Sequence, residues 1–230
     1  MREVIAQSAY FGVVISLAAY GVGVVLQRKF KLAVFNPLLV GIILTTGAVL
    51  LLNVSYEEYN ETAKYLSYLL TPATVALAVP LYQKLALLKK HVLAVIVGIL
   101  SGVLASLGSI LAMAVLFGLS HEEYVTLLPK SVTTAIGMGI SEELGGISTI
   151  TVIVIAFTGV LGNVIAETVC RVFRITEPIA KGLAIGTASH AGGTAKAIEL
   201  GETEGAMSSL AIVVAGLITV VGASVFAMFY

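Results

Sequence analysis

The sequence of 230 residues contains no aspartate and no tryptophan, and only 11% of its residues are charged. Soluble domains carry roughly 25% charged residues. With 58% hydrophobic residues and a mean hydropathy of +1.04, the composition therefore indicates an integral membrane protein. The formal net charge is zero, and no basic patch is interleaved with aromatic residues, so we expect no nucleic-acid partner.

The missing aspartates and the single cysteine also exclude several chemistries. An aspartyl intramembrane protease needs aspartates that this chain lacks, and Cys170 alone cannot close an intramolecular disulfide. His121 is followed by two glutamates, but Val125 occupies the position where a zincin helix carries its second histidine. The sequence also contains no phosphate-binding loop. We therefore expect no enzyme, no cofactor and no metal site.

Eight apolar segments approach the length of about 20 residues that a membrane-spanning helix needs. They cover residues 4–26, 35–54, 64–82, 92–117, 124–140, 148–172, 178–200 and 206–229. The linkers between them are short, so we expect a single transmembrane domain over residues 1–230. The first segment ends in basic residues without a small-residue cleavage pattern, and we interpret it as a membrane span rather than a signal peptide.

The charges in the linkers sort by sign along the chain. The linkers after the first, third and sixth segments hold Arg28, Lys29, Lys31, Lys84, Lys89, Lys90, Arg171, Arg174 and Lys181. The other linkers hold Glu57, Glu58, Glu61, Glu122, Glu123, Glu142, Glu143, Glu199, Glu202 and Glu204. The positive-inside rule then places the basic linkers in the cytoplasm and the N-terminus outside. We expect a multi-pass protein of a prokaryotic plasma membrane.

Residues 124–141 have acidic linkers on both sides, so the charge pattern predicts that they enter and leave the membrane on one face. Pro129 within this segment and the glycines near its end suit such a re-entrant element. The prediction is seven crossings plus one re-entrant segment, and the alternative is eight full crossings.

A weak internal repeat suggests how these segments are organised. TPATVALAVPLYQK from residue 71, followed by a glycine-spaced helix, resembles TASHAGGTAKAIEL from residue 187, followed by a second such helix. Approximate repeat units of residues 35–118 and 148–230 would then have opposite orientations. Inverted repeats with broken helices that meet near the midplane are typical of secondary transporters. The expected fold is an all-α polytopic helical bundle of this kind.

Three polar or proline-containing stretches interrupt the apolar segments: residues 71–80, 129–141 and 186–197. Such backbone is tolerated at membrane depth only where protein buries it or where it lines a cavity. We therefore expect the three stretches to meet at one binding site. The helix breaks that the sequence predicts are Asn36, Pro37, Pro72, Pro80, Pro129, Gly192 and Gly193, of which Asn36-Pro37 reads as an ordinary helix start.

The candidate substrate-binding residues are Thr71, Thr74, Lys130, Ser131, Thr133, Thr134, Ser189, His190 and Thr194. Half-helix N-termini and Lys130 would hold a carboxylate, and the hydroxyls would bind a neighbouring hydroxyl or keto group. His190, the only histidine inside an apolar segment, is a candidate for proton coupling. The alternatives are a Lys130 that extends its amine to the membrane surface and a His190 that is a packed core residue.

Several of these motifs resemble one known family. NPLL at residue 36, LLTPATVALAVPLY at 69, LPKSVTTAIGMGIS at 128, GTASHAGGTAKA at 186 and EGAMSSLA at 204 are similar to the LrgB/CidB membrane family. They also resemble the C-terminal part of the plant plastidal glycolate/glycerate translocator. Residues 135–137 depart from the proline-containing pattern of the family, so the shape of the re-entrant segment does not carry over.

The resemblance implies two functions. One is transport of small monocarboxylates such as glycolate, glycerate or pyruvate. The other is antiholin-like or holin-like control of murein hydrolase activity and autolysis, together with a small LrgA/CidA-type membrane partner. We also expect a homo-oligomer. The broken segments favour transport, because a passive pore does not need helix starts at membrane depth. The partners that we expect are the carboxylate, the lipid bilayer and that small membrane protein.

Overall fold

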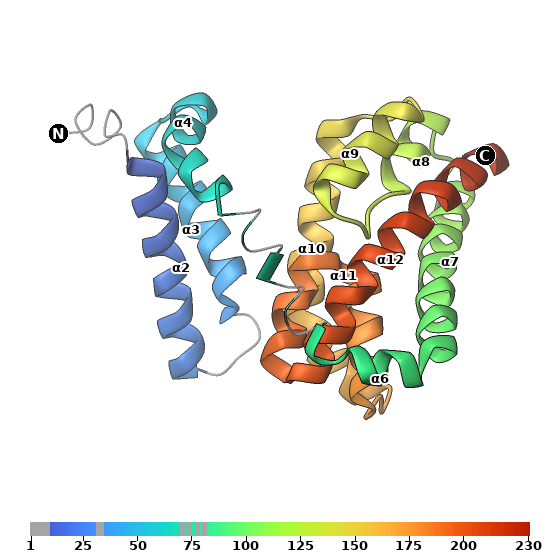
Figure 1. Ribbon diagram of the computed structural model, residues 1–230. Coiled ribbons are helices and arrows are strands. Elements are labelled where there is room, and N and C mark those ends of the chain that lie inside the picture. The colour runs from blue at the N-terminus through green and yellow to red at the C-terminus, as the bar shows by residue number, and fades with distance from the viewer. Residues whose placement is uncertain (1–9, 31–34, 70–71, 73–74, 77–78, 80–81) are drawn as a thin grey trace. The chain divides into compact units, whose positions relative to one another are not determined.

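The computed structural model describes residues 10–30, 35–69, 72, 75, 76, 79 and 82–230 (Figure 1). The chain forms two compact units, Met1–Ala76 and Leu77–Tyr230, which we call unit 1 and unit 2 and describe separately. The described residues form helices and no strands. The all-helical class predicted from the sequence is therefore confirmed.

The described residues of unit 1 form the helices α2 (Phe11–Phe30), α3 (Pro37–Leu52) and α4 (Tyr56–Ser67). The helix start predicted at Asn36-Pro37 is confirmed, because the Asn36 side chain accepts hydrogen bonds from the backbone N–H groups of Leu38 and Leu39 at 2.9 and 3.2 Å. Helix α4 begins with a capping box in which Ser55 and Glu58 bond each other's backbone N–H groups.

Helix α4 corrects only the start of the third predicted segment, residues 64–82. Lys64 lies in the last turn of this polar helix, which also contains the glutamates that the sequence assigned to a linker. Much of the remaining segment lies outside the described residues. The capping box and the acidic first turn favour a helix start at Ser55 that hydropathy alone does not detect.

Unit 2 contains the other helices that the structure describes. They are α6 (Leu85–Lys90), α7 (Val92–Phe117), α8 (His121–Leu127), α9 (Thr134–Glu143), α10 (Ser148–Val172), α11 (Pro178–Leu200), α12 (Glu202–Phe226) and the short 3₁₀ helix η2 (Ala227–Phe229). The bounds of α7, α10 and α11 agree with the segments that the sequence predicts.

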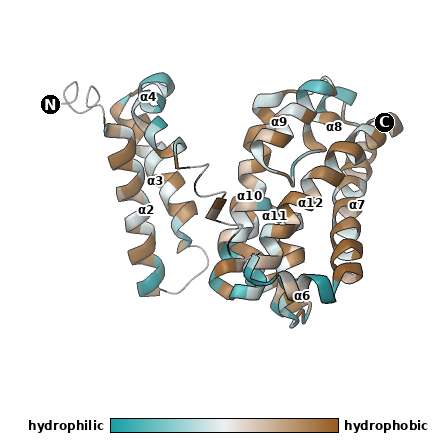
Figure 2. Cartoon of the chain, in the orientation of Figure 1, coloured by the Kyte–Doolittle hydropathy of each residue, from teal (hydrophilic) through white to brown (hydrophobic). Residues whose placement is uncertain are grey.

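Four described helices are long and apolar enough to cross a membrane: Phe11–Phe30, Val92–Phe117, Ser148–Val172 and Glu202–Phe229. Apolar residues cover most of their length in both units (Figure 2). Helix α7 buries one face, an i,i+4 stripe that includes Val95, Ile99, Val103 and Leu107. Large apolar side chains remain exposed elsewhere on these helices, as expected for a surface that contacts lipid.

Unit 2 has two chemically different ends. At the acidic end, α7 and α12 finish beside the start of α8, because Tyr124 Oη donates to the Phe226 carbonyl at 2.9 Å and Tyr230 Oη to the Leu119 carbonyl at 2.7 Å. Helices α8 and α9, with Glu122, Glu123, Glu142 and Glu143, lie at this end (Figure 1). The basic end carries α6, the end of α10 and the start of α11, with Lys84, Lys89, Lys90, Arg171, Arg174 and Lys181.

Helices α8 and α9 form a hairpin that starts and finishes at the acidic end. The Thr126 hydroxyl of α8 accepts from the Ile147 backbone N–H at 2.8 Å, and the Thr151 hydroxyl of α10 donates to the Thr126 carbonyl at 2.9 Å. The start of α10 therefore lies beside α8. With 7 and 10 residues, α8 and α9 span roughly 10 and 15 Å, about half of a bilayer core or less. That residues 124–141 enter and leave a membrane on one face stays a prediction.

Helix α11 is also a hairpin, because its backbone reverses at His190, where φ is 43° and ψ is −137°. Gly182 and Gly186 of the first arm pack against Glu204 and Ser208 of α12, respectively, so the first arm and α12 run in the same direction. In the second arm the order is opposite, because Thr194 bonds Ser208 and a later residue, Ile198, packs against Gly205, which precedes Ser208 in α12. The second arm therefore runs back to the end of unit 2 where the first arm begins.

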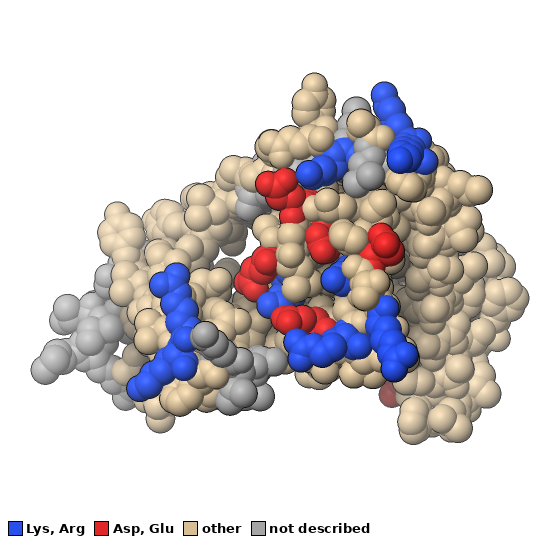
Figure 3. All heavy atoms as spheres, turned by 90° about the horizontal axis from the view of Figure 1, so that it is seen from below, with Lys and Arg blue, Asp and Glu red and all other residues tan. Residues whose placement is uncertain are grey.

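The hairpin corrects two sequence-based expectations. Residues 178–200 do not pass from one end of unit 2 to the other, and the acidic linker that follows them lies at the basic end. Lys84 pairs there with Glu202 at 3.2 Å, and Lys196 pairs with Glu199 at 3.1 Å. Both signs of charge accordingly appear on this face of unit 2 (Figure 3). The positive-inside rule counts Lys and Arg, so paired glutamates do not report which side a linker occupies.

Site-specific labelling tests the reversal of α11. In a Cys170→Ser background, we expect Glu199→Cys to react with a membrane-impermeant maleimide from the same side as Lys89→Cys, because both positions lie exposed at the basic end. Glu143→Cys at the acidic end should react only from the opposite side. Labelling of Glu199→Cys together with Glu143→Cys would contradict the hairpin.

Candidate functional site

The tip of the α11 hairpin is held by hydrogen bonds to the two helices that flank it. His190 Nε2 lies 3.0 Å from the Ile155 carbonyl of α10. The Thr194 hydroxyl donates to the His190 carbonyl at 2.8 Å and lies 2.7 Å from Ser208 Oγ of α12. Asn163 of α10 donates its side-chain amide to the Gly192 carbonyl at 2.7 Å. Backbone groups that the turn removes from helical bonding are thereby partnered inside the protein, as a low-dielectric environment requires.

Glycines allow α10 and α11 to approach closely at this tip. A Cβ atom on Gly192 would lie 2.6 Å from the Cα of Gly159, and one on Gly162 would overlap the Ser189 hydroxyl. Only residues without side chains permit this contact. Gly192 and Gly193 therefore serve helix packing and lie within the second arm. The helix break predicted at these two glycines is instead at His190.

Three predicted binding residues, Ser189, His190 and Thr194, belong to this packed tip. They are 5%, 7% and 0% exposed, respectively, and the tip hydrogen bonds occupy His190 Nε2 and the Thr194 hydroxyl. None of the three lines the main cavity of unit 2. Their position agrees with the alternative reading of His190 as a packed core residue, and it gives all three a role in holding the hairpin closed.

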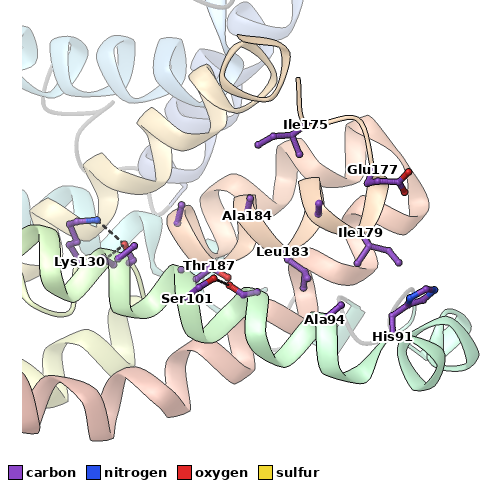
Figure 4. A pocket seen from close by; sticks show the side chains of 17 residues that line it. His91, Ala94, Ser101, Lys130, Ile175, Glu177, Ile179, Leu183, Ala184 and Thr187 are labelled. Carbon is purple, nitrogen blue, oxygen red and sulfur yellow. Dashed lines mark hydrogen bonds between the residues drawn. The ribbon is translucent and has the colours of Figure 1, made fainter. Parts of the chain in front are cut away.

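The main cavity of unit 2 lies between α7 and the first arm of α11, and its volume is about 1010 Å³ (Figure 4). Its walls are mostly apolar or small residues. The lining residues are His91, Ala94, Gly98, Ser101, Gly102, Ala105 and Ser106, then Lys130 and Ser131, then Ile175, Glu177, Ile179, Ala180, Leu183, Ala184, Thr187 and Ala188. The cavity therefore reaches from the basic end of unit 2 to the tip of the α8–α9 hairpin.

Lys130 and Ser131 form the polar inner end of this cavity, and both were predicted as binding residues. Lys130 Nζ donates to Ser131 Oγ at 2.9 Å, and Ser131 Oγ lies 3.2 Å from Ser106 Oγ of α7. Within the described part of the chain, no carboxylate lies within 4.0 Å of Lys130 Nζ, whereas Lys64, Lys84 and Lys196 each have one. The inner end thus presents a half-buried cation and hydroxyls without a counter-charge.

Thr187 lines the same cavity from the first arm of α11 and was not among the predicted residues. Its side chain is 3% exposed, and its hydroxyl has no hydrogen-bond partner among the residues that the structure describes. A Cβ atom on Gly102 would lie 2.7 Å from Thr187 Cγ2, so the glycine allows α7 to approach this side chain. Ser106 was also missed. The available signal was a serine on the glycine-spaced face of an apolar helix, which we interpreted as helix packing alone.

The other predicted site residues lie elsewhere. Thr133 is the N-cap residue of α9 without a side-chain capping bond, and Thr134 is the exposed first residue of that helix. Pro129 lies between α8 and α9, as predicted. Thr71, Thr74 and Pro80 fall outside the described residues, and Pro72 is an isolated described residue, so the predicted contribution of residues 71–80 stays a prediction.

The described residues contain no cluster of three or more His, Cys or Glu side chains that could bind a metal ion. The polar groups of the cavity are the Lys130 amine and several hydroxyls, with His91 and Glu177 at the basic end. An amine with neighbouring hydroxyls can bind an anion that carries a small apolar or hydroxylated body.

The chain is similar to known proteins along most of its length. A family model described as the LrgB-like family matches residues 16–229. Proteins named antiholin-like protein LrgB from Bacillus mycoides, Bacillus cereus and Bacillus anthracis are each 41% identical to the chain over 213 residues. These matches cover 92% of this chain and 93% of each relative. No solved structure is significantly similar to the chain.

The glycine contact at the hairpin tip gives a stability prediction. Gly192→Ala places a methyl group against the α10 backbone, so we expect it to lower the free energy of unfolding by about 2 kcal/mol. Gly108→Ala in α7 is the matched control, because nothing lies within 4 Å of its Cβ position, and alanine is about 1 kcal/mol better than glycine inside a helix. Thermal and denaturant unfolding in detergent measure both. Equal stability of the two variants would rule out the close contact.

Proposed function

Because the chain belongs to the LrgB-like family, we propose that it carries out one defined step in the membrane. That step is the transport of small monocarboxylates, of the size of glycolate, glycerate or pyruvate, through the main cavity of unit 2. The observation that carries this proposal is the amine of Lys130 at the inner end of the cavity, bonded to a hydroxyl and without a carboxylate partner within 4.0 Å among the described residues.

The energetics of a charged amine inside a membrane protein favour an anionic cargo. An unpaired cation at membrane depth costs a few kcal/mol or more, and such residues usually face a pathway or a partner of opposite charge. A carboxylate bound at Lys130 supplies that charge. Ser131 Oγ lies 2.9 Å from the amine and Ser106 Oγ lies 3.2 Å from Ser131 Oγ, so both hydroxyls are near the same anion. The apolar wall of α7 and α11 suits the short carbon body of the same molecule.

We infer an arrangement in the membrane from the two hairpins. In unit 2, α7, α10 and α12 cross the bilayer, and the α8–α9 and α11 hairpins enter from opposite faces. The basic end then faces the cytoplasm by the excess of Lys and Arg in its linkers. This replaces the full crossing of residues 178–200 with a second re-entrant element. Discontinuous segments that meet near the midplane are a common device for binding cargo in secondary transporters.

The cavity is consistent with a state that opens toward the cytoplasm. His91 and Glu177 border it at the basic end, and Lys130 lies at its opposite end (Figure 4). The α8–α9 tip closes it toward the acidic end, where Tyr124, Val125 and Leu128 are at most 1% exposed. Movement of the hairpins against α7 and α10 would expose the same amine to the other face. Proton coupling through His190 stays a prediction, and in this state the imidazole bonds a backbone carbonyl.

Uptake into proteoliposomes tests the transport proposal. We expect Lys130→Met to lower the initial rate of labelled glycolate or pyruvate uptake at least about tenfold, because removing one partner of a buried charge pair typically costs 2–5 kcal/mol. Methionine keeps the length of the side chain, so the fold is preserved. Lys90→Met removes an exposed lysine at the basic end, and it should leave uptake unchanged. Uptake that is insensitive to Lys130→Met would remove the amine from the pathway.

A second candidate function is supported by the names of the relatives. They are called antiholin-like, and they match 92% of this chain, so an antiholin-like role in controlling murein hydrolase activity and autolysis is a direct alternative. In this reading the chain acts with a small LrgA/CidA-type membrane protein. The names do not mention transport, whereas the unpartnered amine and the closed α8–α9 tip favour a carrier over an open pore.

Measurements in cells and in planar bilayers separate the two candidates. If the antiholin-like role is independent of transport, we expect cells that lack the chain to lyse faster, and Lys130→Met to restore the normal rate of autolysis as well as the unaltered chain does. If the role depends on transport, Lys130→Met should fail to restore it. In bilayers a carrier gives no large ohmic current, and such currents without saturation would instead favour a pore.

A further inference from the structure

A second pocket of unit 2, of about 380 Å³, lies at the basic end where α10 finishes and α11 begins. Arg171, Arg174 and Lys181 line it together with a single carboxylate, that of Glu167. Ile175 borders both this pocket and the main cavity, but Lys130 and the hydroxyls of the main cavity do not reach it. We call it the basic pocket, and the proposed transport function does not use it.

The charges of the basic pocket are not balanced inside the protein. Glu167 is shared between Arg171 at 3.0 Å and Lys196 at 3.6 Å, and its charge is therefore already occupied. Within the described part of the chain, Arg174 and Lys181 have no carboxylate within 4.0 Å. Two cations thus face a concave surface without a counter-ion. A guanidinium and an ammonium placed together are the groups that bind phosphate oxygens in proteins.

The backbone places one of these cations by an unusual turn. Arg174 has a φ of 54°, a left-handed conformation that glycine and asparagine adopt more readily than arginine. The turn ends α10, because the Ile175 N–H bonds the Cys170 carbonyl at 2.8 Å and the Arg174 N–H bonds the Arg171 carbonyl at 3.2 Å. Glycine or asparagine would end the helix with less strain, so the presence of arginine here indicates that its side chain binds a ligand.

Two exposed apolar residues lie between Arg171 and Arg174 in the sequence. Val172 and Phe173, the last residue of α10 and its C-cap, are 68% and 73% exposed. Helix α10 is one of the four helices long and apolar enough to cross a membrane, so its end lies at the level of the lipid headgroups. A cationic pocket beside exposed apolar side chains at this level matches a molecule that has both an anionic head and hydrocarbon chains.

From this combination we propose that the basic pocket binds the headgroup phosphate of an anionic phospholipid of the cytoplasmic leaflet. Arg174 and Lys181 contact the phosphate oxygens, and Val172 and Phe173 contact the acyl chains. Basic pockets between membrane helices on the cytoplasmic side have this chemistry. Free inorganic phosphate shares the charged contacts but not the apolar ones, so the two ligands are distinguishable.

Native mass spectrometry of the full chain, released from vesicles of phosphatidylcholine with a minor fraction of phosphatidylglycerol, measures this binding. We expect the unaltered chain to retain phosphatidylglycerol selectively. Arg174→Asn combined with Lys181→Gln should weaken this binding at least about tenfold, because two phosphate contacts are lost. Asparagine tolerates the left-handed turn, so the end of α10 is preserved.

The matched control is Lys89→Gln combined with Lys90→Gln, which removes the same charge from the same end but outside the basic pocket. It should keep the affinity within about twofold. An equal loss in both double variants would mean that the surface charge alone attracts the lipid, and it would overturn the pocket. Displacement of phosphatidylglycerol by millimolar inorganic phosphate would also overturn the lipid assignment, in favour of a site for the free anion.

Discussion

The constraint on which the structure depends is that a hydrocarbon environment leaves no backbone polar group without a partner at low cost. Two stretches of unit 2 break helical bonding, at the α8–α9 tip and at His190, and both are enclosed by other helices. At His190 the bonds come from Ile155, Asn163 and Thr194, and they are possible only because Gly159, Gly162 and Gly192 let the helices approach. The glycine contacts and the hydrogen bonds therefore depend on each other, because the hydrogen bonds can form only where the helices approach closely.

The same enclosure divides the polar residues of the interrupted stretches into two groups. Ser189, His190 and Thr194 are buried in the tip of the α11 hairpin, whereas Lys130 and Ser131 line the main cavity. Polarity at membrane depth thus has two uses, to complete a turn and to bind a ligand. Thr187 is buried like the first group and borders the cavity like the second, and its hydroxyl has no hydrogen-bond partner in the described part of the chain.

Several features were predictable because they depend on local sequence. The bounds of α7, α10 and α11 follow from the lengths of apolar runs, and the start of α3 follows from Asn36-Pro37. Lys130 was identifiable as a lone basic residue between acidic linkers. Ser106 and Thr187 were not, because their relevance depends on which face of α7 meets α11. The side of residues 199–204 was also not predictable, since it depends on the reversal of α11 at His190.

By itself the sequence determined that this chain is an all-helical membrane protein, where most of its apolar helices begin and end, and which stretches could not be ordinary membrane-spanning helices. These properties depend on composition and on neighbours within a few turns. Only the tertiary structure decided that α11 reverses at His190 rather than at its glycine pair, and that its tip is packed while Lys130 borders a cavity. The physical reason is that a reversal is stable only where distant residues satisfy its backbone, and those contacts exist only after the helices have packed.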